Sequence, residues 1–125
     1  MIKPFAIRDV VYFVSSPSRN AIKIGHTGDL RLRLRRLRSA FGRDLVLRAT
    51  VEGSRKEEGR FHTAFLDLHL GAEWFRADRR IDAVIEAILC RDFDMDWLPV
   101  GTNPIRSESA KRFHASRRAR LVEAA

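Results

Sequence analysis

Four side chains in the first half of the chain are of the types that phosphodiester hydrolysis uses. Tyr12 and Lys23 lie in two short apolar runs, Arg33 follows in an arginine-rich segment, and Glu58 lies further along. Phosphodiester cleavage needs a group that activates water and cations that neutralise the charge of the transition state. It usually also needs a divalent metal held by a carboxylate. The four residues can supply these roles, although each type is also common on ordinary protein surfaces.

Two histidines lie near these residues in the sequence. His26 follows the second apolar run, and two roles stay open for it: a proton relay near Tyr12, or a turn residue whose ring is hydrogen-bonded. His62 lies four residues after Glu58 and therefore on the same face of a helix, a spacing that metal sites use. We favour a role for His62 in hydrogen-bonding to the ligand of a metal or in packing the helix. Glu58 itself either holds a metal ion or stabilises the N-terminus of its helix.

A β-hairpin is expected to carry the candidate tyrosine and lysine. The apolar runs 10–14 and 21–24 flank residues 15–20, a small, polar and proline-containing segment that does not easily continue a strand. Residues 25–29 then break the pattern with two glycines, and the arginine-rich segment follows at once. A strand edge, a turn and a basic helix are thereby brought together. The residues expected to share one face are Tyr12, Lys23, His26 and Arg33.

Three helices are expected. The apolar side chains of residues 29–41 recur at i, i+4, i+7 and i+11, which places them on one helical stripe. Ser54 and Glu57 have the spacing of a capping box, so a second helix begins near Arg55. The third helix has the clearest periodicity and covers residues 78–89.

The remaining segments complete an α/β fold. Residues 44–52 are expected to form a third strand, whereas residues 72–76 are either a small strand or an extended segment that packs on the core. The predicted fold is therefore a small, three-stranded, mainly antiparallel sheet, a hairpin plus a third strand, flanked by about three helices. Cys90 is the only cysteine, so no disulfide can form within the chain, and we expect it to be a small core residue.

Composition favours a polyanionic partner. The chain has 125 residues, room for one domain with a modest core, and carries 24 Lys and Arg against 16 Asp and Glu, a net charge of +8. This balance favours nucleic acid, and a basic but unspecialised surface is the alternative. The sequence has no membrane-length apolar run and no apolar signal segment, so we expect no membrane partner and a cytoplasmic location. A monomer or weak homodimer is expected.

The chain is expected to divide near residue 91. Residues 1–91 form the predicted domain, and residues 92–125 form a linker and a basic C-terminal tail, which is expected to be helical over 107–123 or to order only on a partner. The arginine-rich helix and this tail supply the candidate nucleic-acid-binding residues. They are Arg31, Arg35, Arg36, Arg38, Lys111, Arg112, Arg117 and Arg118.

Several short motifs follow one another in a distinctive order. Val10-Val11-Tyr12 and Lys23-Ile24-Gly25 stand on the two predicted hairpin strands, and Arg33 lies eight residues after the second motif. Glu58-Gly59-Arg60-Phe61-His62 and then Gly71-Ala72-Glu73-Trp74-Phe75 follow. In this order they resemble the GIY-YIG nuclease superfamily, in particular a short bacterial and phage branch with KIG in place of YIG and a GEWF-like element. The resemblance covers roughly residues 10–89.

The resemblance implies a divalent-metal-dependent DNA endonuclease. It assigns Tyr12 as general base or water-orienting phenol, Arg33 as the cation that binds phosphate, and Glu58 as the ligand of Mg²⁺ or Mn²⁺. These three groups are then expected to converge on one solvent-open pocket. Lys23 departs from the YIG tyrosine: it either lowers the pKa of the Tyr12 phenol, holds a phosphate, or marks a domain that binds without cutting.

Two other functions stay open. The chain could be a nucleic-acid-binding module of the same fold that does not cut, or a basic adaptor that docks on an acidic protein. The sequence does not specify whether DNA is single- or double-stranded, and RNA is an alternative substrate.

Overall fold

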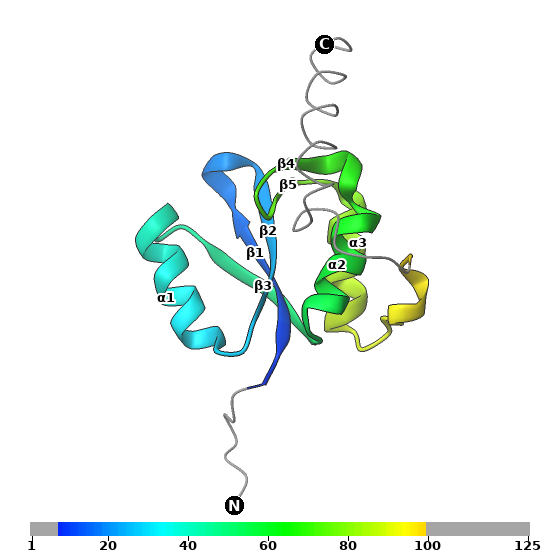
Figure 1. Cartoon of the computed structure of the whole chain (residues 1–125). Helices are drawn as coiled ribbons and strands as arrows, with labels where there is room; N and C mark the ends of the chain where they lie inside the picture. The colour runs from blue at the N-terminus through cyan, green and yellow to red at the C-terminus, as the bar shows by residue number, and fades with distance from the viewer. Residues whose placement is uncertain (1–7, 100–125) are drawn as a thin grey trace, which may run out of the picture.

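Five antiparallel strands and three α-helices build residues 8–99, the part of the chain that this computed structural model describes (Figure 1). The strands are β1 (Val10–Ser16), β2 (Ala21–Thr27), β3 (Val46–Glu52), β4 (His69–Gly71) and β5 (Trp74–Arg76). The helices are α1 (Leu30–Phe41), α2 (Arg55–Ala64) and α3 (Arg79–Leu89), and short 3-10 turns span Pro17–Arg19, Leu66–Leu68 and Met95–Trp97. The strand order is β3-β1-β2-β5-β4.

The predicted strand number was wrong: the sheet has five strands rather than three. The two additional strands, β4 and β5, have three residues each, too few for a recognisable alternation of apolar and polar residues. The helices and the three longer strands lie near their predicted positions, with two differences: β2 continues to Thr27, into the segment 25–29 that was expected to break the strand, and β3 begins two residues later than expected. Residues 72–76, which were expected to be either a small strand or an extended segment, contain the strand β5.

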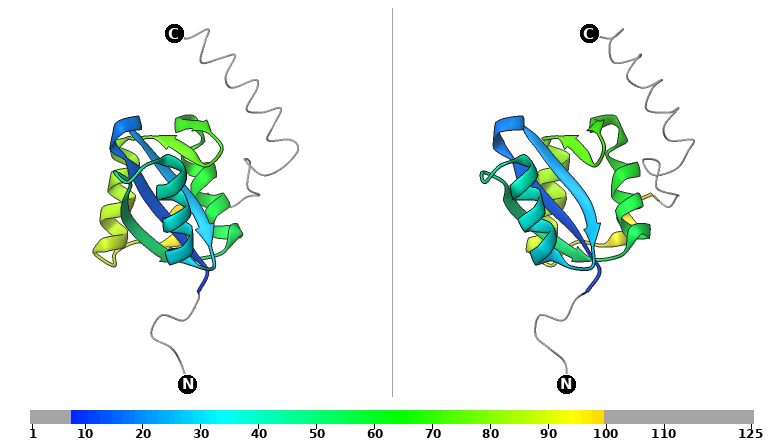
Figure 2. Two further views of the ribbon diagram at one scale, coloured as in Figure 1. Left: turned by 90° about the vertical axis from the view of Figure 1, so that its left-hand side faces the viewer. Right: turned by 60° about the vertical axis from the view of Figure 1, so that its left-hand side comes forward.

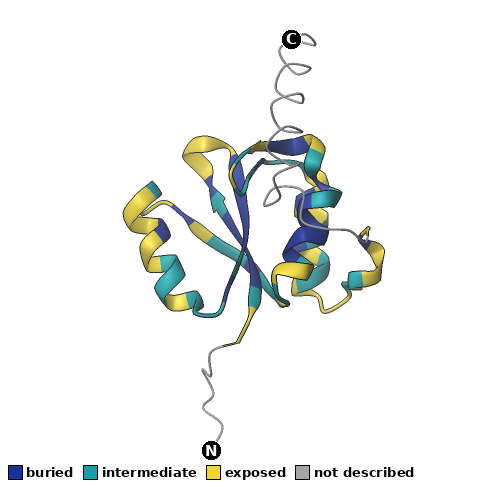
Figure 3. Ribbon diagram, in the orientation of Figure 1, coloured by how far each residue is buried: buried dark blue, intermediate teal, exposed yellow. Residues whose placement is uncertain are grey.

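The two faces of the sheet carry separate apolar clusters. On one face, buried side chains of β1 and β2 pack with α2 and α3; examples are Phe13 of β1 and Phe61 of α2. On the other face, Tyr12 of β1 packs with Leu37 of α1. Figure 2 shows α1, in cyan, crossing its face of the sheet, and Figure 3 shows that the buried residues follow the central strands and the inner side of α2. Successive residues of a strand point to opposite faces, which explains how neighbours in β1 enter different clusters.

β2 has an edge that is only partly paired. β5 pairs with β2 at residues 21–23, and the Ile24 amide donates to the carbonyl of Glu73 at 3.0 Å. Among the described residues, no strand pairs with this edge of β2 beyond Ile24. Side chains from either face of the sheet can therefore meet beside the start of β5, where its pairing with β2 stops.

The helix ends follow their local sequence signals. The Asp29 carboxylate accepts from the Leu32 amide at the start of α1, and Gly42 ends that helix. At the start of α2, the predicted capping box forms: the Ser54 amide donates to the Glu57 carboxylate at 2.8 Å. This hydrogen bond lowers the pKa of the Glu57 carboxyl.

Glu57→Ala is expected to lower the free energy of unfolding at neutral pH by about 1 kcal/mol, because the Ser54 amide at the start of α2 loses its acceptor. Since folding lowers the pKa of Glu57, its charge stabilises the protein above the unfolded pKa of about 4.3, and that stabilisation is lost as pH falls through the folded value. Urea denaturation at neutral and acidic pH measures both effects. Glu86→Ala, an exposed site on α3, is the control, and equal losses from both variants would contradict the capping role.

In the C-terminal half, the structure corrects the expectation for Cys90 and describes only the first part of the predicted linker and tail. Cys90 is exposed at the end of α3 rather than a core residue. The first part of the predicted linker packs on the core, with Leu98 buried and Phe93 stacked against Phe61. The rest of residues 92–125, including the predicted helix, lies outside the described residues, so the division near residue 91 stays a prediction. Within residues 8–99, none of the helices has the length and apolar character to cross a membrane.

Candidate active site

The phenol of Tyr12 lies directly over Gly25. The two residues are paired across β1 and β2, so their side-chain positions share the α1 face of the sheet. A Cβ atom at position 25 would lie 2.4 Å from the phenol oxygen and 2.5 Å from Cζ, closer than real Cβ contacts allow. The glycine is therefore required for space: the Tyr12 ring occupies the volume that any other residue would fill.

Gly25→Ala is expected to displace the phenol and to cost about 1–3 kcal/mol of stability through overpacking. A displacement near 1 Å in a catalytic group lowers a reaction rate by about a hundredfold, so any activity that depends on the phenol falls by about that factor. Single-turnover rates and urea denaturation measure the two effects. Gly53→Ala is a useful comparison, because its Cβ would also be crowded, but by the Glu57 side chain rather than by Tyr12.

Arg33 contacts the same phenol from α1. Its Nη1 donates to the Tyr12 oxygen at 3.2 Å and also contacts the backbone carbonyl of His26 at 3.4 Å. The helix begins directly after the Asp29 cap, so Arg33 lies in its first turns, above the end of β2. The structure thus brings together two residues that are 21 positions apart, as the sequence led us to expect.

The electrostatics of Tyr12 link it to the carboxylates as well. Burial is the main cause that raises the pKa of the phenol; the hydrogen bond from Arg33 opposes this rise, and the charges of Glu73 and Glu58 add to it. The phenol is therefore protonated at neutral pH. Because the charges of Glu58 and Glu73 both raise the pKa of Tyr12, the two carboxylates lie within electrostatic reach of the phenol oxygen.

Lys23 is nearly buried on the Tyr12 face and is paired with a carboxylate. Its Nζ lies 3.6 Å from Oε1 of Glu73, and it also lies 5.5 Å from the centre of the Trp74 ring and 5.9 Å from that of Phe41. Burial lowers the pKa of Lys23, while the charge of Glu73 acts in the opposite direction. Lys23 thus connects the phenol side of the site to the carboxylate side.

Glu58, His62 and Glu73 form a compact group beside β2. One possible ligand atom from each residue lies within 4.8 Å of the others. Glu58 and His62 are one turn apart on α2, and Glu73 comes from the turn between β4 and β5. The His62 Nε2 lies 2.7 Å from the carbonyl oxygen of Ile24, so the ring is anchored to β2. Two carboxylates and an imidazole form a donor set suited to a divalent metal ion.

Glu73 is a candidate functional residue that sequence reasoning missed. We expected residues 72–76 to form a small strand or an extended segment that packs on the core, and Trp74 and Phe75 do pack in the core clusters. The carboxylate has a different position, between Lys23 and the ligand atoms of Glu58 and His62. The available signal was a charged residue within an otherwise apolar and small-residue motif.

His26 lies apart from this group. It belongs to β2 rather than to a turn, and it pairs with Val11, whose side chain is in the opposite cluster from Tyr12. Its Nε2 lies 3.2 Å from a carboxylate oxygen of Asp9, without hydrogen-bond geometry. The expected sharing of one face by Tyr12, Lys23, His26 and Arg33 therefore does not hold for the His26 ring, because alternation along β2 turns it away. Only its backbone carbonyl contacts Arg33.

The expected solvent-open pocket is also corrected. The exposed fraction is 0% for both Tyr12 and Glu58, and 8% for Lys23, whereas Arg33 is partly exposed. The apolar packing of α1 and α2 against the two faces of the sheet is the reason, since each helix covers one side of the group. These side chains therefore meet inside the protein, and the partly exposed Arg33 guanidinium lies at the edge of the site.

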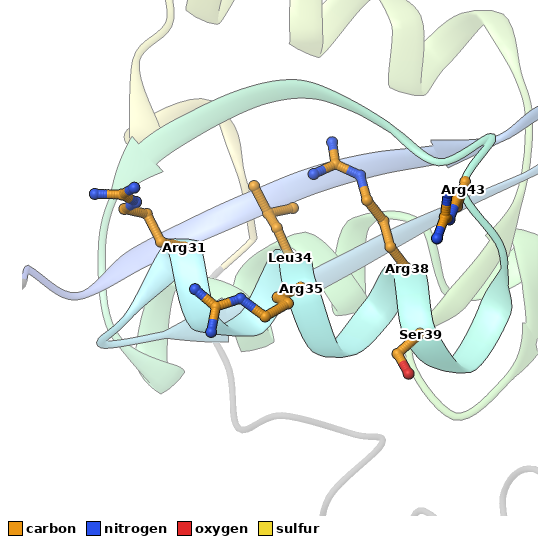
Figure 4. Close-up of a pocket in the computed structure, with 6 residues that line it drawn as sticks. All are labelled: Arg31, Leu34, Arg35, Arg38, Ser39 and Arg43. Atoms are coloured by element: carbon orange, nitrogen blue, oxygen red, sulfur yellow. The ribbon is translucent and has the colours of Figure 1, made fainter.

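The exposed arginines of α1 fall on two flanks of the helix. Arg36 is three residues after Arg33 and lies on the same flank. The other flank borders a groove of about 620 Å³, and Figure 4 shows Arg31, Arg35 and Arg38 along α1 and Arg43 beyond its end. Its lining residues are Arg31, Leu34, Arg35, Arg38, Ser39 and Arg43. None of these arginines forms an ion pair with another described residue, so their charge faces solvent. The four basic candidates of the tail lie outside the described residues.

Comparison with known proteins identifies the domain. The family model described as "T5orf172 domain" matches residues 9–90, which include the hairpin, α1, α2 and the Glu73 turn. This domain is found in phage and bacterial nuclease-like proteins related to GIY-YIG and HNH-type endonucleases. No curated protein and no solved structure matches the chain. By its match over most of its length, the chain belongs to the T5orf172 domain family.

Proposed function

We propose that the chain is a divalent-metal-dependent DNA endonuclease of the GIY-YIG type. The observation that carries this proposal is the hydrogen bond between Arg33 and the phenol of Tyr12, with the Glu58 carboxylate within electrostatic reach. A nuclease-like domain family supports it. Phenol, guanidinium and carboxylate are the three groups that such a reaction needs at one place.

Each residue has a distinct proposed role. Tyr12 holds the attacking water by hydrogen bonding and, once its proton is lost, accepts a proton from it. Arg33 and Lys23 neutralise the charge that develops on the phosphate. Glu58 would hold Mg²⁺ or Mn²⁺. When bound, that ion supplies Lewis-acid polarisation of the phosphate and stabilises the leaving oxygen.

The phosphate is proposed to approach at the partly paired edge of β2. Arg33 is the only one of the four proposed catalytic residues that is not buried, so it is the first that a phosphate would meet. Arg36 lies on the same flank of α1 and extends the positive charge outward. Entry of the phosphate must then expose the phenol and the carboxylate, so substrate binding and a local opening of the site are coupled.

A non-cleaving nucleic-acid-binding module of the same fold is the second candidate. Two observations favour it: Tyr12 and Glu58 are completely buried, and a lysine occupies the place of the YIG tyrosine, where it is paired with Glu73. In this function the exposed arginines bind phosphates, and the buried group contributes only to stability.

Nucleic-acid binding is proposed to use the groove flank of α1. Replacing Arg31, Arg35 and Arg38 together by Gln is expected to weaken DNA binding and to lower the slope of log affinity against log salt by about 2 to 3, since each phosphate contact contributes about 0.9. Titration of labelled DNA at several salt concentrations measures this slope. The control replaces Arg76, Arg79 and Arg91, which are exposed outside this groove, by Gln and makes the same change in charge. Equal losses in both triple variants would assign the binding to net charge alone.

The full-length protein distinguishes the candidate functions directly. We would incubate it with supercoiled DNA, single-stranded DNA and RNA in the presence of Mg²⁺, Mn²⁺ or excess EDTA. Metal-dependent cleavage that EDTA abolishes is the result expected of the endonuclease. Salt-sensitive binding without cleavage under any of these conditions would establish the binding module instead. Absence of DNA or RNA affinity at low salt would refute both and leave a basic protein adaptor.

A further inference from the structure

Three side chains beside β2 offer possible metal-ligand atoms, whereas the proposed function uses only one of them, Glu58. The carboxylates of Glu58 and Glu73 and a ring nitrogen of His62 lie within 4.8 Å of one another. In an octahedral site with metal–ligand distances of about 2.1 Å, neighbouring ligands are about 3.0 Å apart and opposite ligands about 4.2 Å apart. The 4.8 Å limit exceeds these distances by about 0.6 Å for opposite ligands and by about 1.8 Å for neighbouring ones, so side-chain rotations must draw the ligand atoms together around an ion.

The hydrogen bond of His62 to the backbone determines the tautomer of its neutral ring. A carbonyl oxygen only accepts, so the Nε2 of His62, 2.7 Å from the Ile24 oxygen, is the protonated nitrogen. In the neutral ring, the lone pair is then on Nδ1. Metal-binding histidines are commonly oriented in this way, by donating their other N–H to a backbone carbonyl. The ring is also held by Phe75, whose centre lies 5.1 Å away.

Glu73 is held in position by backbone and charge. Its carbonyl accepts from the Ile24 amide at 3.0 Å, so the same residue of β2 anchors both Glu73 and His62. Its carboxylate lies beside Lys23. When all are ionised, two carboxylates and one ammonium carry one net negative charge, which a divalent cation would convert to one net positive charge. A positive centre suits a phosphate ligand.

We propose that Glu58, His62 and Glu73 together form the metal centre, and that its imidazole makes the centre prefer Mn²⁺ to Mg²⁺. Oxygen ligands suit both ions, whereas imidazole nitrogen binds Mg²⁺ poorly and binds first-row transition metals well. This inference deepens the proposed nuclease function, which by itself requires only Glu58 as ligand. It makes His62 a ligand rather than a residue that supports one.

The test measures binding of Mn²⁺ alone, without nucleic acid, to the full-length protein. We expect the wild type to bind Mn²⁺ at least about tenfold more tightly than Mg²⁺ in competition experiments followed by electron paramagnetic resonance. His62→Gln replaces the nitrogen ligand by an amide oxygen and should reduce this preference by about tenfold or more. Glu73→Gln should weaken binding of both ions. His69→Gln is the matched control, because His69 is also buried and bonds to a carbonyl but lies outside the group.

A direct spectroscopic measurement keeps the test decisive if a variant does not fold. Electron spin echo envelope modulation of Mn²⁺ bound to the wild type should show coupling to an imidazole nitrogen, and His69→Gln should retain it. Tight Mn²⁺ binding without nitrogen coupling, or an unchanged metal preference in folded His62→Gln, would overturn the three-ligand centre. Metal-dependent cleavage could still hold in that case, with Glu58 as ligand. Conversely, nitrogen-coordinated Mn²⁺ in a protein that cuts no nucleic acid would refute the nuclease and support the centre.

Discussion

Glu58→Gln is expected to lower the rate of DNA cleavage by about a thousandfold or more while the protein stays folded. The amide has nearly the shape of the carboxylate but lacks the charge that would hold a divalent ion. The charge stabilisation that such an ion supplies amounts to several kcal/mol, and about 4 kcal/mol corresponds to a thousandfold change in rate. Single-turnover cleavage of supercoiled DNA at saturating Mg²⁺ or Mn²⁺ measures the loss.

A neighbouring carboxylate on the same helical turn provides the control. Glu57 accepts the Ser54 amide at the start of α2 and lies outside the group of ligand atoms, so Glu57→Gln should retain cleavage. Circular dichroism melts of both variants establish that they are folded. Cleavage at the wild-type rate in Glu58→Gln would refute the assignment of Glu58 as metal ligand, whatever the state of the other residues.

Tyr12→Phe is expected to reduce cleavage by about a hundredfold to ten-thousandfold, the usual contribution of a general acid or base. The ring and its packing remain, so we expect a loss of only about 1 kcal/mol in stability, from the hydrogen bond with Arg33. DNA affinity should be nearly unchanged, because the phenol is buried and the exposed arginines are intact. Loss of DNA affinity with an unaltered cleavage rate at saturation would contradict the catalytic role.

The pH dependence distinguishes the two roles open to Tyr12. Burial raises the pKa of the phenol, so a base role predicts a wild-type rate that increases with pH from neutral into the alkaline range. The Tyr12→Phe rate should not show this increase. A role in orienting water predicts that the phenol acts while protonated, so the wild-type rate would have no rising phase attributable to Tyr12.

Combining the Tyr12 and Gly25 substitutions tests how the two residues are coupled. If Gly25→Ala acts on cleavage only by displacing the phenol, then adding it to Tyr12→Phe should cause little further loss of activity. The stability losses should still accumulate, because Cζ of a phenylalanine ring would meet the added Cβ as the tyrosine does. Full additivity in the rates would indicate that Gly25 affects cleavage by another route.

Much of the secondary structure follows from local signals in the sequence. The helix of residues 30–41 begins after the Asp29 cap and ends at Gly42, and the Ser54 capping box starts the next helix. The hairpin forms where apolar runs flank the turn residues. β4 did not follow from local signals and β5 was only one of two alternatives, because these three-residue strands are stabilised by pairing, β5 with β2 and β4 with β5, rather than by their own pattern.

The residues of the candidate site also fall into two sets: those that the sequence indicated, and those whose positions only the structure revealed. Tyr12, Arg33 and Glu58 were chosen from motif order, and the structure places the first two in contact and the third within electrostatic reach. The roles of the neighbouring residues depended on contacts between distant segments. Glu73 lies beside Lys23 because β5 pairs with β2 at that point, and the His26 ring lies on the other face because of strand alternation.

The amino-acid sequence by itself determined the helices, the hairpin and the residue types available for phosphate chemistry, since capping, periodicity and charge are local properties. Only the tertiary structure decided that these residues are buried and that Glu73 and His62 accompany Glu58. It also decided that Gly25 must lack a side chain. These outcomes depend on which segments pack beside the edge of β2, and packing between segments far apart in the chain leaves little local signal.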